Sequence, residues 1–76
     1  MDEEAQLKQA FANRLDTAIK TLKLNQCQAA EKAGLTQPCI SQYLNALRLP
    51  GYRELRKICV GLNIGANYLL GIDNEP

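Results

Sequence analysis

The sequence predicts a single domain of the all-α class, a compact arrangement of five helices. Apolar residues recur at steps of three and four along most of the chain, the spacing that places side chains on one face of a helix. The alternation of two expected for strands is absent, and 76 residues are enough for one domain only. We therefore expect one modest core and no β-sheet.

The first helix is predicted from about Glu4 to Lys23. Phe11, Leu15 and Ile19 follow one another at steps of four within this range, so their side chains form an apolar stripe. Residues 1–4, which are mainly acidic, are expected to precede the domain as a flexible N-terminus. The domain itself is expected over residues 5–72, followed by a short C-terminal tail over residues 73–76.

A second helix is predicted to begin at Gln26. The side chain of Asn25 is placed to accept a hydrogen bond from the first turn, and Gln28 can reach back to the Asn25 amide, which together make a capping box. Gly34 is expected to end this helix, because glycine adopts the left-handed conformation without a steric penalty. The helix is therefore only about two turns long.

A third helix is predicted after Leu35 turns inward, with Thr36 as its cap. Since a residue before proline favours extended geometry, Gln37 before Pro38 is an alternative cap that would shift the start by one residue. The inward side is expected to carry Ile40, Tyr43, Leu44 and Leu47. Two short capped helices joined through a glycine turn form the pattern of a helix-turn-helix.

Two further helices complete the prediction. Pro50 and Gly51 interrupt the chain, and a fourth helix follows that ends near Gly61 to Asn63. Its apolar face is expected to consist of Leu55, Ile58, Cys59 and Leu62. A short fifth helix is predicted from Ala66 to Leu70.

The charges are unevenly distributed along the chain. The formal net charge is only +1, but residues 5–72 carry nine basic and three acidic side chains, a balance of +6. A basic folded region between acidic ends is typical of a protein that binds nucleic acid, and the acidic ends can shield the basic face from non-specific contacts. On charge alone, an ordinary solvated surface remains the alternative interpretation.

Several classes of function are disfavoured by composition. Apolar runs are too short for a membrane span or a signal peptide, so we expect a cytoplasmic protein without a membrane partner. Three widely spaced cysteines with no histidine favour neither a disulfide framework nor a zinc site, and we expect them to behave as small core residues. The absence of histidine also removes the commonest acid-base group, so we expect no enzyme, metal or small-molecule cofactor.

The stretch from Asn25 to Tyr43 resembles the XRE or Cro/CI family, the lambda-repressor-like DNA-binding domains. The likeness extends from Arg14 to Gly71 without a gap, about three quarters of the chain. The features that agree in register are a capped Gln26, the turn from Ala30 to Gly34, the inward Ile40, Pro50 after the third helix, and the closing Tyr68-Leu69-Leu70-Gly71. The resemblance implies a five-helix domain that binds double-stranded DNA.

The third helix is then expected to read bases in the major groove. Its N-terminal part presents Gln37, Pro38, Ser41 and Gln42 on one face, and glutamine can make two hydrogen bonds to adenine. A merely solvated polar face is the alternative. The resemblance further implies phosphate contacts at Gln26, Asn45, Arg48 and Arg53.

Two positions depart from the family pattern. Ile19 and Leu44 replace an arginine and a glutamate that often pair in relatives, and we expect these two apolar side chains to touch. Ala46 replaces a glycine that commonly ends the third helix, so this helix is expected to run on towards Leu49. Whether Leu47 and Leu49 are covered or form an exposed apolar patch is left open.

The function predicted first is a phage- or prophage-type repressor that binds a palindromic operator as a homodimer. The dimer surface is expected near the last helix, and its candidates are Ile64, Leu69, Leu70 and Ile72; completion of the monomer core is the alternative for Leu69 and Leu70. Other functions considered are an antitoxin or restriction-control regulator of the same fold and a protein-interaction module without DNA. The sequence leaves open whether the chain is complete or part of a longer repressor.

Overall fold

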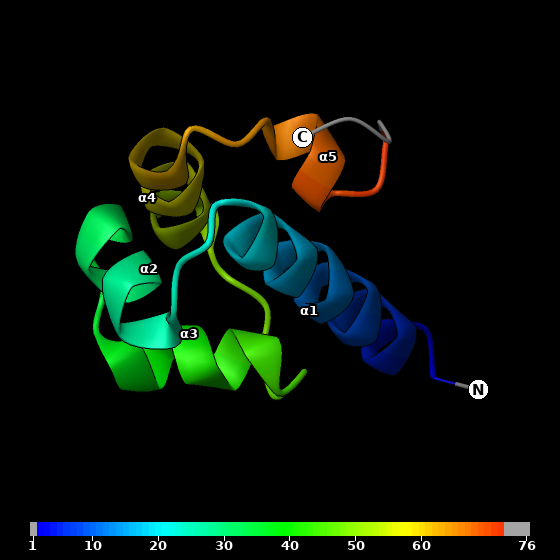
Figure 1. The fold of residues 1–76 in the computed structure, drawn as a ribbon. Coiled ribbons are helices and arrows are strands. Elements are labelled where there is room, and N and C mark those ends of the chain that lie inside the picture. The colour runs from blue at the N-terminus through cyan, green and yellow to red at the C-terminus, as the bar shows by residue number, and fades with distance from the viewer. Residues whose placement is uncertain (1, 73–76) are drawn as a thin grey trace.

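The computed structural model describes residues 2–72, and these contain five α-helices and no strand (Figure 1). The helices are α1 (Glu3–Thr21), α2 (Gln26–Ala33), α3 (Gln37–Leu44), α4 (Tyr52–Leu62) and α5 (Ala66–Leu69). The predicted all-α class and the number of helices are confirmed. The predicted tail over residues 73–76 lies outside the described residues.

Helix α1 begins earlier and ends earlier than predicted. The Asp2 side chain caps it by accepting a hydrogen bond of 3.1 Å from the Glu4 amide, so Glu3 and Glu4 belong to the first turn and not to a separate acidic segment. Their carboxylates are favourable there because the helix dipole is positive at this end. The helix ends at Thr21, because Lys23 adopts the left-handed conformation with φ 60°.

The caps of α2 agree with the prediction. The Asn25 side chain accepts a hydrogen bond of 2.7 Å from the Gln28 amide, and the Gln28 side chain accepts one of 3.0 Å from the Asn25 amide. Gly34 ends the helix with φ 72°. Both ends of this two-turn helix are therefore determined by local hydrogen bonds.

Helix α3 starts as predicted but stops short of the predicted extension. Thr36 is the cap, and its hydroxyl accepts a hydrogen bond of 3.3 Å from the Cys39 amide; Gln37 is the first helical residue. The expected extension towards Leu49 is wrong, because Ala46 adopts the left-handed conformation with φ 58° and turns the chain. Leu47 was expected on the inward side but is 65% exposed, since it lies beyond this turn.

The last two helices lie close to their predicted bounds. Helix α4 is preceded by Gly51 as its N-cap and is closed by Asn63, which takes the left-handed conformation with φ 55°. Helix α5 ends one residue earlier than predicted, with Leu70 as its C-cap.

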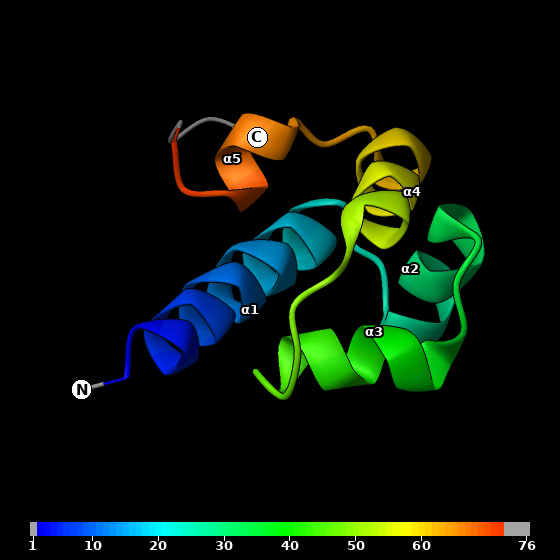
Figure 2. The ribbon, with the colours of Figure 1, turned by 180° about the vertical axis from the view of Figure 1, so that it is seen from behind.

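The five helices enclose one apolar core. Helix α1 packs against α3 and α5, while α2 packs against α3 and α4, so that α1 crosses the molecule between α3 on one side and α5 on the other (Figures 1 and 2). The buried side chains of the core are Phe11, Leu15, Ala18, Ile19, Ala29, Ala30, Ala33, Ile40, Tyr43, Ile58, Leu62, Ile64, Tyr68 and Leu69. Leu44 is half-buried and packs against this cluster, of which Ile19 is a member. Direct contact between these two side chains stays a prediction.

Helices α2 and α4 approach each other very closely at a single glycine. A Cβ atom added to Gly61 would lie 2.6 Å from the Ala33 Cα and would overlap the Lys32 carbonyl oxygen. This close approach holds α4 against the C-terminal end of α2. The backbone of α4, and not a side chain, therefore forms part of the support for the helix-turn-helix.

Arg14 connects α1 to α5. Its guanidinium donates a hydrogen bond of 3.2 Å from Nη1 to the Tyr68 carbonyl oxygen and lies 5.2 Å from the centre of the Tyr68 ring. A guanidinium above an aromatic face is attracted by the negative charge of the ring face. The short α5 is thus attached to the long first helix.

The three cysteines differ in their surroundings, and all are free thiols. Cys39 and Cys59 pack against the core as expected, and burial raises the pKa of the Cys59 thiol. The expectation was wrong for Cys27, which is exposed because it lies off the α2 face that carries the buried alanines. Among residues 2–72 no helix has the length and apolar character that crossing a bilayer requires.

Candidate nucleic-acid interface

Helix α3 lies at the edge of the molecule (Figures 1 and 2). Gln37 and Pro38 are exposed, and Ser41 and Gln42 are half-buried. The opposite side of the same helix is anchored by Ile40 and Tyr43, both fully buried. The structure therefore brings the four predicted base-contacting residues together on one face of α3.

Tyr43 is the main anchor of this helix. Its ring meets the Phe11 ring of α1 edge-to-face, with centroids 6.0 Å apart and planes at 90°. Burial raises the pKa of the Tyr43 phenol well above its ordinary value of 10.0, and the neighbouring Cys39 thiol adds to this shift. The hydroxyl has no hydrogen-bond partner of good geometry among the described residues. Tyr43 thus holds α3 on α1 as a neutral, mainly apolar group.

Asn45 closes the polar face at the C-terminal end of α3. Its side-chain Nδ2 donates hydrogen bonds to the Ser41 carbonyl oxygen at 2.8 Å and to the Ser41 Oγ at 3.2 Å. Because the Ser41 hydroxyl oxygen accepts from Asn45, its own proton is left to donate elsewhere. Asn45 was predicted to contact phosphate, and in this structure it orients Ser41.

Arg48 lies beside the same face although it follows α3. Its Nη1 donates a hydrogen bond of 3.1 Å to the Gln42 Oε1, and its guanidinium carbon lies 5.7 Å from the centre of the Tyr43 ring. Arg48 is an exposed residue, so its remaining N–H groups can reach solvent or a ligand. Arg48, which was predicted to contact phosphate, is thus hydrogen-bonded to Gln42, which was predicted to contact a base.

The other two phosphate candidates lie at helix N-termini. Gln26 is exposed as the first residue of α2, and this end of α2 lies beside α3 in both ribbon views (Figures 1 and 2). Arg53 is exposed as the second residue of α4, after the loop that leaves α3. Helix N-termini favour anions, because their amides and the helix dipole both present positive charge. The N-terminal end of α2 thus lies beside α3, whereas the N-terminus of α4 follows it after a loop.

The four dimer candidates fall into two pairs. Ile64 and Leu69 belong to the monomer core, so they are not available to a partner. Leu70 and Ile72 are 57% and 73% exposed. Only the second pair remains suitable for an intermolecular contact.

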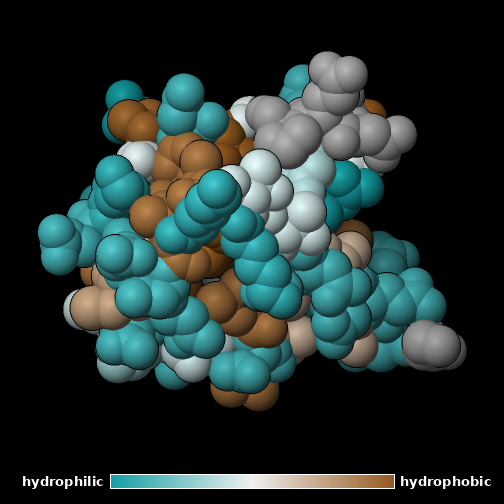
Figure 3. Space-filling view, viewed as in Figure 1, coloured by the Kyte–Doolittle hydropathy of each residue, from teal (hydrophilic) through white to brown (hydrophobic). Residues whose placement is uncertain are grey.

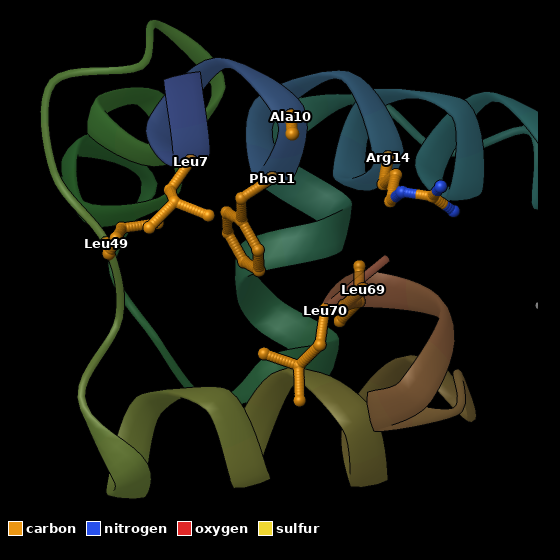
Figure 4. A pocket seen from close by; sticks show the side chains of 7 residues that line it. All are labelled: Leu7, Ala10, Phe11, Arg14, Leu49, Leu69 and Leu70. Atoms are coloured by element: carbon orange, nitrogen blue, oxygen red, sulfur yellow. The ribbon is translucent and has the colours of Figure 1, made fainter. Parts of the chain in front are cut away.

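Leu70 also borders an apolar pocket of about 170 Å³. Side chains from α1, from the α3–α4 loop and from the end of α5 line it, and Leu7, Leu49 and Leu70 point towards a common space (Figure 4). The residues that line it are Leu7, Ala10, Phe11, Arg14, Leu49, Leu69 and Leu70. Leu49 is therefore part of an apolar depression, whereas Leu47, in the same loop, is exposed and does not line it.

The surface differs between the regions around α3 and α4. Hydrophilic residues cover most of the surface near α3, apart from a small apolar group at its edge (Figure 3). Apolar residues gather on the same view over the side where α2 and α4 lie (Figure 3). A polar surface on the exposed helix is what recognition of base edges and phosphates requires.

Two of these arrangements were not predicted. The contact between Ser41 and Asn45 is an i,i+4 pair on a helix, so the spacing alone carried a signal for it. The contact between Gln42 and Arg48 spans six residues and depends on the turn at Ala46, so no periodic pattern in the sequence predicts it.

Comparison with known proteins agrees with this geometry. The family model described as helix-turn-helix matches residues 15–69, from α1 to the end of α5. A curated relative, the uncharacterised HTH-type transcriptional regulator YqaE of Bacillus subtilis (strain 168), is 36% identical over 66 residues, which are 86% of this chain and 57% of that protein. The chain thus spans little more than half the length of this relative.

The chain belongs to the XRE-type helix-turn-helix family, with α2 and α3 as its helix-turn-helix. The resemblance drawn from Asn25 to Tyr43 is therefore confirmed.

Proposed function

We propose that this protein binds double-stranded DNA in a sequence-specific manner through α3 and regulates transcription. The observation that carries the proposal is the polar face of Gln37, Ser41 and Gln42 on a helix whose opposite side is buried through Ile40 and Tyr43. A helix with amide and hydroxyl groups on its outer face is suited to the major groove, where each base pair presents a distinct pattern of donors and acceptors. The name of the relative, a transcriptional regulator, supports the same function.

The surroundings of α3 support contacts to the DNA backbone. Gln26 is the first residue of α2, and a helix N-terminus favours an anion, which supports a phosphate contact there. Arg48 and Arg53 add positive charge around the loop that leaves α3. Residues 5–72 carry an excess of six positive charges, which favours binding to a polyanion.

We further propose that the protein acts as a repressor of the phage or prophage type and binds a palindromic operator as a homodimer. Exposed Leu70 and Ile72 offer an apolar surface for a second copy at the end of α5. In such a dimer the two recognition helices would enter successive major grooves, about 34 Å apart. Twofold symmetry of the protein would then be matched by twofold symmetry of the operator.

Selection of bound sequences from a random duplex library tests both proposals. We expect one enriched motif with two inverted half-sites about one helical turn apart. An enriched motif without inverted symmetry would contradict the homodimer but not DNA recognition. No enrichment over the starting library in dilute buffer would contradict sequence-specific binding itself.

The salt dependence of binding to the selected duplex provides a second readout. Contacts to several phosphates release counterions, so the affinity should fall by orders of magnitude between about 50 and 200 mM salt. Fluorescence anisotropy with a labelled duplex measures this slope. An affinity for the duplex that is independent of salt would contradict the proposed phosphate contacts.

A further inference from the structure

The side chains of Gln42 and Arg48 form one hydrogen-bonded pair on the outer face of α3. The Arg48 Nη1 donates to the Gln42 Oε1 at 3.1 Å, so one of the two lone pairs of the glutamine amide oxygen is engaged. The two residues are half-buried and exposed, respectively, and both belong to the surface proposed to face DNA. Their combination determines which hydrogen-bonding groups this part of the face can offer.

The backbone after α3 accounts for the position of Arg48. The left-handed Ala46 reverses the chain, and two hydrogen bonds close the helix: from the Leu47 amide to the Gln42 carbonyl oxygen at 2.9 Å, and from the Ala46 amide to the Tyr43 carbonyl oxygen at 3.1 Å. This is the Schellman pattern of helix termination. It returns residue 48 to the last turn of α3.

Tyr43 provides a second contact for the guanidinium. Its ring is fully buried and its centre lies 5.7 Å from the Arg48 guanidinium carbon, within the range of a cation–π interaction. The arginine is thus held by an amide oxygen and by a buried ring. The pair is arranged before any ligand arrives, which lowers the entropy lost on binding.

The hydrogen-bonding groups left to this pair are mainly donors. A free glutamine recognises adenine by accepting from N6 and donating to N7. Here the oxygen of Gln42 lies against a positive charge, so a further donor such as the adenine amino group is disfavoured there. What remains outward is the amide NH₂ of Gln42 and the unused N–H groups of Arg48, since arginine has five donors and no acceptor.

We infer that Arg48 sets the base preference of Gln42, and that the pair reads a guanine. Guanine presents two acceptors, O6 and N7, in the major groove, whereas adenine presents one acceptor and one donor. A pair that offers mainly donors matches guanine at both positions. This inference rests on the proposed function and replaces the adenine preference that glutamine alone would predict. In it Arg48 both engages the Gln42 amide oxygen and supplies donors of its own.

Binding of single-base variants of the selected operator tests the inference. The position read by Gln42 is first located as the one whose preference disappears in Gln42→Ala. For the wild-type protein we expect guanine at that position to be favoured roughly ten- to hundredfold over adenine. Arg48→Met keeps the length of the side chain but removes its donors. We expect this variant to lose the guanine preference and to favour adenine there, because the Gln42 oxygen is released.

Two further variants act as controls. Arg56→Met removes one exposed positive charge on α4 without touching Gln42, and it should retain the guanine preference. Arg48→Lys keeps a charged donor and should retain part of that preference. Thermal unfolding of each variant checks that α3 remains folded.

Two results would overturn the inference. One is a wild-type preference for adenine at the position read by Gln42. The other is an Arg48→Met variant that binds all four bases more weakly by the same factor and has a flatter salt slope, because this would identify Arg48 as a phosphate contact. A wild-type protein that binds no duplex would instead refute the proposed function, and the inference with it.

Discussion

Gly61 of α4 lies against the backbone of Ala33 and Lys32 at the end of α2, so closely that no side chain fits between them. A Cβ atom at this position would be 2.6 Å from the Ala33 Cα. Since backbone atoms cannot move aside as a flexible side chain can, the two helices would have to separate to admit even a methyl group.

We therefore expect Gly61→Ala to lower the free energy of unfolding by about 3 kcal/mol, at the upper end of the range for overpacked sites. Urea unfolding followed by circular dichroism measures this change. Gly51→Ala is the matched control, because a Cβ there meets only the flexible Glu54 side chain, at 3.1 Å, and its φ of −76° suits alanine. The control should change stability by less than about 1 kcal/mol. Equal stabilities of the two variants would contradict the packing of α2 on α4.

Ala46→Gly is expected to stabilise the protein by about 0.5–1 kcal/mol. Alanine at φ 58° bears a steric cost that glycine avoids, and part of the gain is offset by the greater freedom of glycine in the unfolded chain. Ala10→Gly provides the comparison, because Ala10 lies inside α1, where glycine should cost about 1 kcal/mol. The two substitutions should thus have opposite signs in thermal unfolding. A destabilised Ala46→Gly variant would indicate that the chain does not turn at this residue.

Tyr43 should make the stability sensitive to alkaline pH. Burial raises the pKa of its phenol in the folded protein above the ordinary value of 10.0 that holds in the unfolded chain. Above about pH 10 the unfolded chain therefore loses a proton that the folded protein keeps, and stability falls as the pH rises further. Below that pH this residue contributes no pH dependence.

Tyr43→Phe should remove this part of the alkaline loss and change stability at pH 7 by less than about 1 kcal/mol, because the buried hydroxyl lacks a good hydrogen bond. Tyr52→Phe, which removes a phenol at an exposed position, is the matched control. Denaturant unfolding at a series of pH values checks both. Identical profiles for the wild type and Tyr43→Phe would refute the raised pKa.

Gln42 and Arg53 should affect DNA binding in different ways. Gln42→Ala should relax the preference at one base position by about 1–3 kcal/mol, whereas Arg53→Ala should weaken binding to all sequences and reduce the slope of log affinity against log salt by about one. Gln6→Ala and Arg56→Ala, at exposed positions of α1 and α4, are the controls. Anisotropy titrations at several salt concentrations separate the two effects. If neither substitution alters binding, the DNA-facing surface has been assigned incorrectly.

Leu70→Glu should weaken self-association if the end of α5 forms the dimer surface. A charge placed at a buried apolar contact is costly, while the same charge on a free surface is tolerated. Leu47→Glu is the control, because Leu47 is similarly exposed but lies after α3. Sedimentation equilibrium across a range of concentrations measures the association constant. A dimer that withstands Leu70→Glu and dissociates with Leu47→Glu would place the interface elsewhere.

Local hydrogen-bonding rules account for much of what the sequence predicted correctly. The capping box of Asn25 and Gln28, the left-handed Gly34 and the Thr36 cap each involve residues within four positions of one another. The wrong extension of α3 has a related cause. Alanine has a high helix propensity, which says nothing of the closing hydrogen bonds that force Ala46 into a left-handed turn.

By itself, the sequence determined the number, order and approximate bounds of the helices and the polar face of α3, because periodicity and capping are properties of neighbouring residues. The tertiary structure alone decided which of the C-terminal apolar residues are buried, with Ile64 and Leu69 in the core and Leu70 and Ile72 outside. It also decided the approach of Gly61 to α2 and the contact of Arg48 with Gln42. These features depend on how elements distant in the sequence pack, or on where a turn redirects the chain. A local sequence pattern predicts neither the packing nor the turn.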